Sequence, residues 1–320
     1  MDIAALRQGS PRAIARMLTK VENGTLDYTK WWPEMFPYLG SAFVVGITGW
    51  PGVGKSTLLG RLLEHAAHNT AERVGVIAVD PSSQVSGGAV LADRLRMMST
   101  ALNPNVFVRS LASRGAQTGV SATTLGAVDV MDVAGFHWVF IETVGVGQTQ
   151  VDILEMADVV VLVTAPGLGD EVQAIKAGIL EIPDAIVINM ADRPGTQRTM
   201  TGLRWALRQG HDTGPDILST VASEDIGIDT VWNRLHDLRT RAAGPTLAEH
   251  RRLRNRRRAF AVVEELWREA LRQAAEESQI STLLAGTAEG RNDPSYVGQA
   301  LIRRAAQHIL ALVPEKGVRY

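Results

Sequence analysis

The stretch that decides the fold is Gly46–Thr57, which reads GITGWPGVGKST. From Gly49 to Ser56 it has the spacing Gly-x-x-x-x-Gly-Lys-Ser, directly after an apolar run and before a segment of helical character. In that context the pattern predicts a loop that holds phosphates, because its glycines let successive backbone N–H groups surround a β-phosphate. Lys55 would neutralise the β- and γ-phosphates, and the Ser56 hydroxyl would bind Mg²⁺. The residues predicted to bind nucleotide are Gly49, Gly52, Val53, Gly54, Lys55, Ser56 and Thr57.

Short apolar runs on both sides of this loop predict an α/β fold. They are rich in Val and Ile and lack polar alternation, which is typical of parallel strands covered on both faces. Stretches between them are long enough for crossover helices, such as Lys55–Ala67 and Asp170–Leu180. We therefore expect a P-loop nucleoside triphosphatase with a mostly parallel central sheet flanked by helices. The predicted strands are Phe43–Gly49, Val74–Asp80, Phe136–Thr143, Val159–Thr164 and Ala185–Asn189.

Both ends of the chain lack this alternation of strands and helices. Residues 1–40 are expected to form a helical extension that closes with a Trp31-Trp32-Pro33 loop, and residues 41–243 form the nucleotide-binding domain. Residues 244–320 show no strand pattern and are expected to form a helical arm, with a turn at Gly286–Pro294. Six arginines lie between Arg251 and Arg258, where apolar residues at helical spacing favour a solvated or subunit-facing helix over a nucleic-acid contact.

The composition limits the classes of partner and compartment. The chain has 320 residues, a formal net charge of -1 and 45% hydrophobic residues, so no nucleic-acid or membrane partner is expected. It has no cysteine, which excludes disulfides and thiolate metal sites and fits a reducing compartment. We see no signal peptide or membrane-spanning run, and therefore expect a cytoplasmic protein. The seven histidines are scattered and show no metal-ligand spacing.

Acidic residues end two of the predicted strands. Asp80 ends the run VGVIAVD, and Glu142 lies near the end of FHWVFIET, shortly before Gly145. A carboxylate at the tip of a strand beside the P-loop can hold Mg²⁺ directly or through water, and a glycine just after it lets a backbone N–H reach the γ-phosphate. Helix capping is the alternative role for these acids.

Asn189-Met190-Ala191-Asp192 follows the last predicted strand. GTPases use Asn-Lys-x-Asp at this place, where the Asp carboxylate accepts two hydrogen bonds that guanine donates and adenine cannot. Here Met190 replaces the lysine; its thioether stem can cover the base plane, but it carries no charge. The spacing favours guanine, with helix capping by Asn189 or Asp192 as the alternative.

Several further motifs make the chain resemble one family, the MeaB/ArgK-type P-loop GTPases, which act on cobalamin-dependent acyl-CoA mutases such as methylmalonyl-CoA mutase. Their order and spacing agree with that family over most of the predicted nucleotide-binding domain. The motifs are GWPGVGKST (Gly49–Thr57), VDPSSQVSGGAVLADRLRM (Val79–Met97), SRG (Ser113–Gly115), ETVGVGQT (Glu142–Thr149) and PGLGDEVQAIKAGI (Pro166–Ile179).

The resemblance implies a role for each matching position. Lys55, Ser56 and Thr57 hold phosphate and Mg²⁺, and Asn189 and Asp192 read guanine. Catalysis is implied for Lys55, Glu142, Gly145 and Lys176, and metal binding for Ser56, Asp80, Asp93 and Glu142. Asp80 and Asp93 belong to the first switch, Glu142 and Gly145 to the second, and Lys176 to a third that reaches the nucleotide when a partner organises the loop.

The implied function is that of a GTPase chaperone, with GTP or GDP and Mg²⁺ as cofactors. It gates cobalamin loading of an acyl-CoA mutase and protects that enzyme, with a low basal rate that the mutase stimulates. The mutase's adenosyltransferase is a further possible partner, and residues 244–320 are implied to form a homodimer. Arg114 and Lys176 are candidates for the positive charge that phosphoryl transfer needs, and Gln148 for orienting water.

The chain differs from the family at three places. Met190 replaces the usual lysine, Thr149-Gln150 replaces the usual Ser-Glu, and the guanine loop is reduced to Ser219-Thr220-Val221-Ala222, so Ser219 is not assigned. Two other functions stay open. A nickel-enzyme maturation GTPase would need Cys or clustered His, and a P-loop small-molecule kinase would need an acceptor pocket and a lid.

Overall fold

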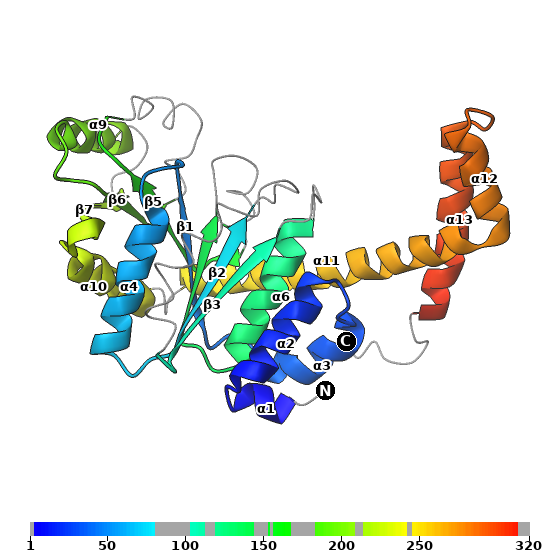
Figure 1. Ribbon diagram of the computed structural model, residues 1–320, viewed down its shortest axis with the longest axis horizontal. Coiled ribbons are helices and arrows are strands. Elements are labelled where there is room, and N and C mark those ends of the chain that lie inside the picture. The colour runs from blue at the N-terminus through cyan, green and yellow to red at the C-terminus, as the bar shows by residue number, and fades with distance from the viewer. Residues whose placement is uncertain are drawn as a thin grey trace. The chain divides into compact units, whose positions relative to one another are not determined.

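The computed structural model describes residues 3–80, 103–112, 119–143, 153, 156–167, 183–208, 214–241 and 245–312 (Figure 1). Their strands form one seven-stranded sheet in the order β3-β2-β4-β1-β5-β6-β7, and every neighbouring pair is parallel. The P-loop strand β1 is therefore central, between β4 and β5. The strands are β1 (Phe43–Gly49), β2 (Val74–Asp80), β3 (Val106–Ala112), β4 (Trp138–Thr143), β5 (Val159–Thr164), β6 (Ala185–Ile188) and β7 (Asp216–Ser219).

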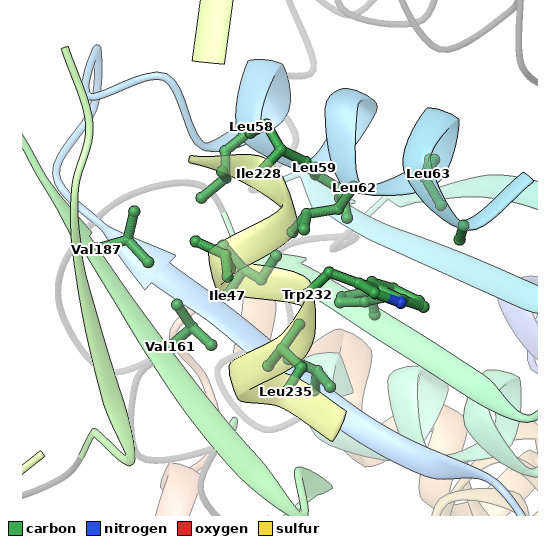
Figure 2. Packing of buried hydrophobic residues seen from close by; sticks show 14 of the residues in the cluster. Ile47, Leu58, Leu59, Leu62, Leu63, Val161, Val187, Ile228, Trp232 and Leu235 are labelled. Atoms are coloured by element: carbon green, nitrogen blue, oxygen red, sulfur yellow. The ribbon is translucent and has the colours of Figure 1, made fainter. Parts of the chain in front are cut away.

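Helices cover both faces of the sheet, which explains the continuous apolar character of its central strands. On one face, α4 (Lys55–Asn69) and α10 (Ile228–Arg241) pack against alternate strand residues such as Ile47, Val161 and Val187 (Figure 2). The opposite face is covered by α6 (Gly119–Val133), which contacts β2 and β4, and by α9 (Thr196–Arg208). Leu203 of α9 packs against the intervening strand residues Leu162, Ile186 and Ile188. The expected α/β fold is confirmed.

All five predicted strands are present, with ends that differ by two residues or fewer. The two edge strands, β3 and β7, were not predicted from the sequence. β3 carries Arg109 and Ser110, and the four residues of β7 are partly or fully exposed, so neither has a continuous buried apolar run. The predicted crossover helix Asp170–Leu180 lies outside the described residues.

The amino-terminal extension is helical, as expected, and packs on the sheet domain. It contains α1 (Ile3–Arg7), α2 (Pro11–Glu22), α3 (Tyr28–Met35) and the 3-10 turn η1 (Phe36–Tyr38). The loop predicted at Trp31-Trp32-Pro33 is wrong, because these residues lie within α3. Trp31 and Trp32 are buried, and Trp32 Nε1 donates to Asp129 Oδ2 of α6 at 2.8 Å. Burial of the two indoles stabilises the helix although it contains Pro33, which lies near its carboxyl end.

One buried carboxylate fixes the chain where the extension meets β1. Asp132 of α6 accepts backbone hydrogen bonds from Gly40 at 2.5 Å, Ser41 at 3.0 Å and Ala42 at 2.8 Å. Burial raises the pKa of Asp132 above its usual value, although these N–H donors oppose the effect. The carboxyl group thereby positions the three residues that lead into β1, the strand before the P-loop.

The chain divides into two compact units, residues 1–255 and 256–320. The helix α11 (Pro245–Glu276) belongs to both, while α12 (Ser278–Ala288) and α13 (Pro294–Leu312) lie in the second. In that unit the small residues Ala270, Ala274 and Ala305 are buried together. The helical character expected for this region is confirmed, with the predicted turn lying between α12 and α13. The functional division at residues 40 and 243 stays a prediction.

Within the first unit, the start of α11 is fixed to the sheet. Arg254 Nη2 lies 2.6 Å from Asp158 Oδ1, and the side chains are 2% and 0% exposed. Asp158 Oδ2 also accepts the Val44 N–H at 2.8 Å. The arginine-rich segment is thus a helix, as expected, but Arg254 is buried in an ion pair rather than solvated.

In the described part of the chain, no helix is both long and apolar enough to cross a lipid bilayer.

Candidate nucleotide-binding site

The segment between β1 and α4 has the geometry of a phosphate-binding loop. Gly49 has φ 145° and lies so close to β5 that an added Cβ would come within 2.0 Å of the Val163 carbonyl oxygen. Gly54 has φ 84° and forms the N-cap of α4 without a side-chain cap. The amino end of a helix favours anions, because its N–H groups and dipole both point outward there. The glycines therefore bring backbone, and no side chain, to the place where a phosphate would bind.

Lys55 begins α4 and folds back over this loop. Its Nζ donates hydrogen bonds to the Gly49 carbonyl oxygen at 2.9 Å and to the Trp50 carbonyl oxygen at 3.0 Å. The residue is only 7% exposed, so its ammonium group is held close to the amino end of the helix. Such a buried cation, bonded to carbonyl oxygens of the loop, is placed to contact a phosphate held by the same loop.

Ser56 and Glu142 come together from different elements. The Ser56 hydroxyl of α4 donates to Glu142 Oε1 of β4 at 2.6 Å. The parallel register pairs Glu142 with Ile47 on one side and with Ala78 on the other, which places it one strand away from the P-loop strand. A hydroxyl and a carboxylate are the oxygen donors that Mg²⁺ prefers, so the two residues fit a magnesium site. The two residues are in contact, and their binding of a metal stays a prediction.

The remaining predicted switch residues are less fully described. Asp80 ends β2, paired with Ala112 of β3, at the same edge of the sheet as the P-loop; the description covers its backbone only. Asp93, Gly145 and Lys176 lie outside the described residues, as do Arg114 and Gln148. Among the described residues, no group of three or more His, Cys, Asp or Glu could hold a metal ion.

Asn189 joins three segments of the site. Its Nδ2 donates to the Val53 carbonyl oxygen of the P-loop at 2.9 Å. Its Oδ1 accepts from Thr220 Oγ1 at 3.1 Å and from the Ala222 N–H at 3.0 Å. The residue is 2% exposed. Asn189 therefore holds the P-loop against the loop after β7, which the sequence alone did not indicate.

Met190 and Asp192 follow Asn189 in the chain. Met190 has a positive φ of 55° and is partly buried against the hydrophobic cluster that contains Ile47, Val161 and Val187. Its Cε lies 3.6 Å from the point that a Cβ added to Gly54 would occupy. Its thioether thus covers the P-loop at the place where the family has a lysine. Asp192 is exposed in the turn that follows, and the neighbouring Ala191 N–H donates to the Thr220 carbonyl oxygen at 3.0 Å.

The loop after β7 belongs to the site, although only its sequence Ser219–Ala222 had been noted. It contains the 3-10 turn η4 (Ala222–Glu224), which packs against α4. Arg61 of α4 donates hydrogen bonds to two carbonyl oxygens of this turn. Arg61 did not stand out in the sequence, because isolated arginines are common and only the fold shows what they contact.

Taken together, a parallel sheet, a P-loop at the end of its central strand and a carboxylate on the neighbouring strand define a P-loop nucleoside triphosphatase. The family model described as methylmalonyl Co-A mutase-associated GTPase MeaB matches residues 14–278. The chain therefore belongs to the MeaB family and is a GTPase of the MeaB/ArgK type.

Individual proteins agree with this assignment. The chain is 40% identical to a putative GTPase of Pyrococcus abyssi over 314 residues, which are 95% of this chain and 90% of that protein. It is 35% identical to GTPase ArgK of Escherichia coli over 255 residues, 75% of each chain. The crystal structure of a LAO/AO transport system kinase is similar with a TM-score of 0.63, 26% identity and 96% coverage of both chains. A nickel-bound HypB from Helicobacter pylori shares the fold, with a TM-score of 0.50, 15% identity, and coverage of 69% of this chain and 97% of that one.

Proposed function

We propose that this GTPase is a chaperone that gates cobalamin loading of a cobalamin-dependent acyl-CoA mutase of the methylmalonyl type, and protects that enzyme. The observation that carries the proposal is the match of residues 14–278 to a family whose description names this mutase. The match includes the whole nucleotide site together with part of the helical regions at both ends. A cytoplasmic location, a contact with the adenosyltransferase and a homodimer formed by residues 244–320 stay predictions.

The phosphates of GTP would lie in the P-loop, against the amino end of α4. Lys55 would exchange its bonds to the Gly49 and Trp50 carbonyl oxygens for bonds to the β- and γ-phosphates. Ser56 and Glu142 would hold Mg²⁺, Ser56 through its hydroxyl and Glu142 directly or through water. Bound there, Mg²⁺ would neutralise the charge that develops on the phosphate oxygens. Asp80 at the end of β2 is proposed to complete that environment.

Guanine would be selected at the loops after β6 and β7. The exposed Asp192 carboxylate would accept the N1–H and the 2-amino N–H of the base, which adenine does not offer. Asn189 would act by holding the surrounding loops, because both ends of its side-chain amide are bonded to them. Met190 would cover the base plane with its thioether in place of the aliphatic stem of a lysine.

The mutase would accelerate hydrolysis by organising the switch segments. Lys55 and the metal supply part of the charge that the transition state needs, and complete organisation is worth about 10³ to 10⁵ in rate. We propose that Lys176 supplies a further positive charge when the mutase binds, and that Gly145 and Asp93 respond to the γ-phosphate and metal. These three positions rest on the family motifs alone.

Hydrolysis assays with the purified chain test the proposal. We expect slow GTP hydrolysis, still slower ATP hydrolysis, and an increase in the GTP rate when methylmalonyl-CoA mutase is added. Lys176→Ala should remove most of that increase and leave the basal rate and GDP affinity nearly unchanged. An unrelated acyl-CoA enzyme without cobalamin serves as the control partner. A GTP rate that does not respond to any cobalamin-dependent acyl-CoA mutase would contradict the chaperone role.

The same assays separate the other two functions. The similar LAO/AO transport system protein is named a kinase, so the fate of a labelled γ-phosphate should be followed. Transfer to water supports the GTPase chaperone, whereas transfer to a small-molecule acceptor supports a kinase. Stoichiometric nickel binding by the purified chain would favour a nickel-enzyme maturation GTPase. The likeness to HypB concerns the fold alone.

A further inference from the structure

Arg61 lies in the second turn of α4, and its guanidinium group contacts the loop between β7 and α10. Its Nε donates to the Ala222 carbonyl oxygen at 3.2 Å, and its Nη2 donates to the Ser223 carbonyl oxygen at 3.3 Å. The third nitrogen, Nη1, donates to Glu64 Oε2 at 2.8 Å on the same helix. The planar guanidinium thus binds two consecutive carbonyls while a carboxylate fixes its orientation.

These contacts connect directly to the candidate base site. Ala222 is 1% exposed, and its N–H donates to Asn189 Oδ1 at 3.0 Å. Asn189 Nδ2 in turn donates to the Val53 carbonyl oxygen of the P-loop at 2.9 Å. Because the P-loop continues into α4, these bonds close a ring from Arg61 through Ala222, Asn189 and Val53 back to the helix. All four residues belong to the first compact unit.

The bonds to Arg61 also set the direction of the loop's amide groups. The C=O and N–H of a trans peptide point in opposite directions, so the Ala222 carbonyl held toward α4 directs the Ser223 N–H away from the helix. Residues Ser223–Ile226 are exposed, and Asp225 and Gly227 have positive φ values of 62° and 78°. Within the loop, the Glu224 and Ile226 N–H groups donate to the Val221 carbonyl oxygen at 2.9 and 3.2 Å. The Ser223 N–H is therefore the amide whose outward direction follows from the bonds to Arg61.

We propose that Arg61 is a positioning residue for base selection. By holding the Ala222 and Ser223 carbonyls against α4, it turns the Ser223 N–H toward the 6-position of a purine bound at Asp192. A donor at that position can donate a hydrogen bond to a 6-oxo group but is opposed by a 6-amino group, so the loop favours guanine over adenine. The phosphate contacts of Lys55 do not depend on it. This inference rests on the proposed guanine site at Asp192.

Calorimetry with the full-length chain, using GDP, ADP and IDP, tests the proposal. Arg61→Met keeps an apolar stem of similar length and removes all the donors. Its GDP affinity should fall by about tenfold, because the nucleotide must then order the loop that Arg61 no longer holds, while its ADP affinity changes little. The preference for GDP over ADP should therefore shrink by about the same factor. IDP keeps the 6-oxo group but lacks the 2-amino group, so its affinity should fall as much as that of GDP.

Glu64→Gln is the matched control, because both bonds from Arg61 to the carbonyls can remain; its GDP preference should be close to that of the wild type. Thermal unfolding without nucleotide confirms that each variant folds. An equal loss of GDP and ADP affinity would overturn the proposal, since it would indicate damage to the phosphate site. An unchanged preference in Arg61→Met would also overturn it, while leaving the guanine site intact. A wild-type chain that binds GDP and ADP equally would overturn the guanine site and this inference together.

Discussion

The Ser56 hydroxyl and the Glu142 carboxylate lie 2.6 Å apart, although 86 positions separate them in the chain. Ser56 is in the first turn of α4 and Glu142 is near the end of β4, which pairs with the P-loop strand. Only the parallel register of the sheet brings them together. The contact supplies two oxygen donors at one point beside the phosphate loop, which is where a metal bound to a triphosphate has to be held.

Removing the charge of Glu142 should weaken this metal site selectively. Glu142→Gln keeps the size of the side chain and an oxygen for the Ser56 hydroxyl, but it no longer attracts a divalent cation as a carboxylate does. We expect magnesium-dependent GTP hydrolysis to fall by roughly 10–100-fold, with GDP affinity in the absence of Mg²⁺ nearly unchanged. A magnesium titration of the hydrolysis rate measures this. Glu269→Gln on the exposed face of α11 is the control, and an unaltered magnesium dependence would show that Glu142 is not part of the site.

Exchange of Asp192 for asparagine should change the preferred base. The carboxylate can only accept hydrogen bonds, whereas the amide of Asp192→Asn also donates, which suits the 2-oxo group of xanthine. GDP affinity should fall by at least about 10²-fold, because a donor then faces the guanine 2-amino group, and XDP affinity should rise. Competition between labelled GDP and XDP measures the exchange. If both nucleotides lost affinity to the same extent, Asp192 would have a structural role and not a base-reading one.

The ion pair between Arg254 and Asp158 should be important for stability. Both side chains are almost completely buried, so Arg254→Met would leave an uncompensated carboxylate in the interior and cost about 3–5 kcal/mol. Asp158→Asn in the same chain removes that charge and keeps an oxygen for the Val44 N–H. We therefore expect the double variant to be more stable than Arg254→Met alone.

Urea unfolding of the full-length chain measures these free energies. Arg272→Met is the comparison, since Arg272 is 58% exposed and its pairs with Glu269 and Glu276 should contribute little. Equal stabilities of the two single arginine variants would contradict the role assigned to Arg254.

A pH dependence should come from Glu72, which joins the start of β2 to β4 and α10. It accepts hydrogen bonds from Trp138 Nε1 at 2.5 Å and from Arg239 Nη1 at 2.8 Å. Burial alone raises the pKa of Glu72, but these bonds, together with the charges of Arg239 and His236, outweigh it and hold the pKa below the ordinary value of 4.5. A lowered folded-state pKa stabilises the fold above the unfolded-state pKa, and this contribution is lost as the pH falls through the folded value.

The wild-type chain should therefore lose more unfolding free energy between pH 7 and about pH 3 than Glu72→Gln, which has no charge to lose at this position. Denaturant unfolding at both pH values gives the comparison. At pH 7 the variant should be the less stable of the two, and parallel pH profiles of the two proteins would rule out a contribution from Glu72.

Much of the site was predictable because its chemistry is local. The glycines, Lys55 and Ser56 are close together in the chain, and their spacing alone indicates a phosphate loop. The five buried strands were predicted for a similar reason, since strands covered on both faces must be apolar throughout. The edge strands β3 and β7 were missed because an edge strand is only partly covered and its sequence need not be apolar. At Trp31-Trp32-Pro33, burial of the two indoles overrode the helix-breaking tendency of Pro33.

By itself, the sequence determined the α/β class, the phosphate loop and the family, because each can be recognised from short motifs or apolar runs whose residues are adjacent in the chain. The tertiary structure decided which distant groups meet: Glu142 with Ser56, Asn189 with Val53, Arg61 with Ala222 and Arg254 with Asp158. The two residues of each pair come from segments far apart in the chain. Such contacts depend on strand order, register and helix packing, and these are set by the free energy of the whole folded chain and not by any one segment.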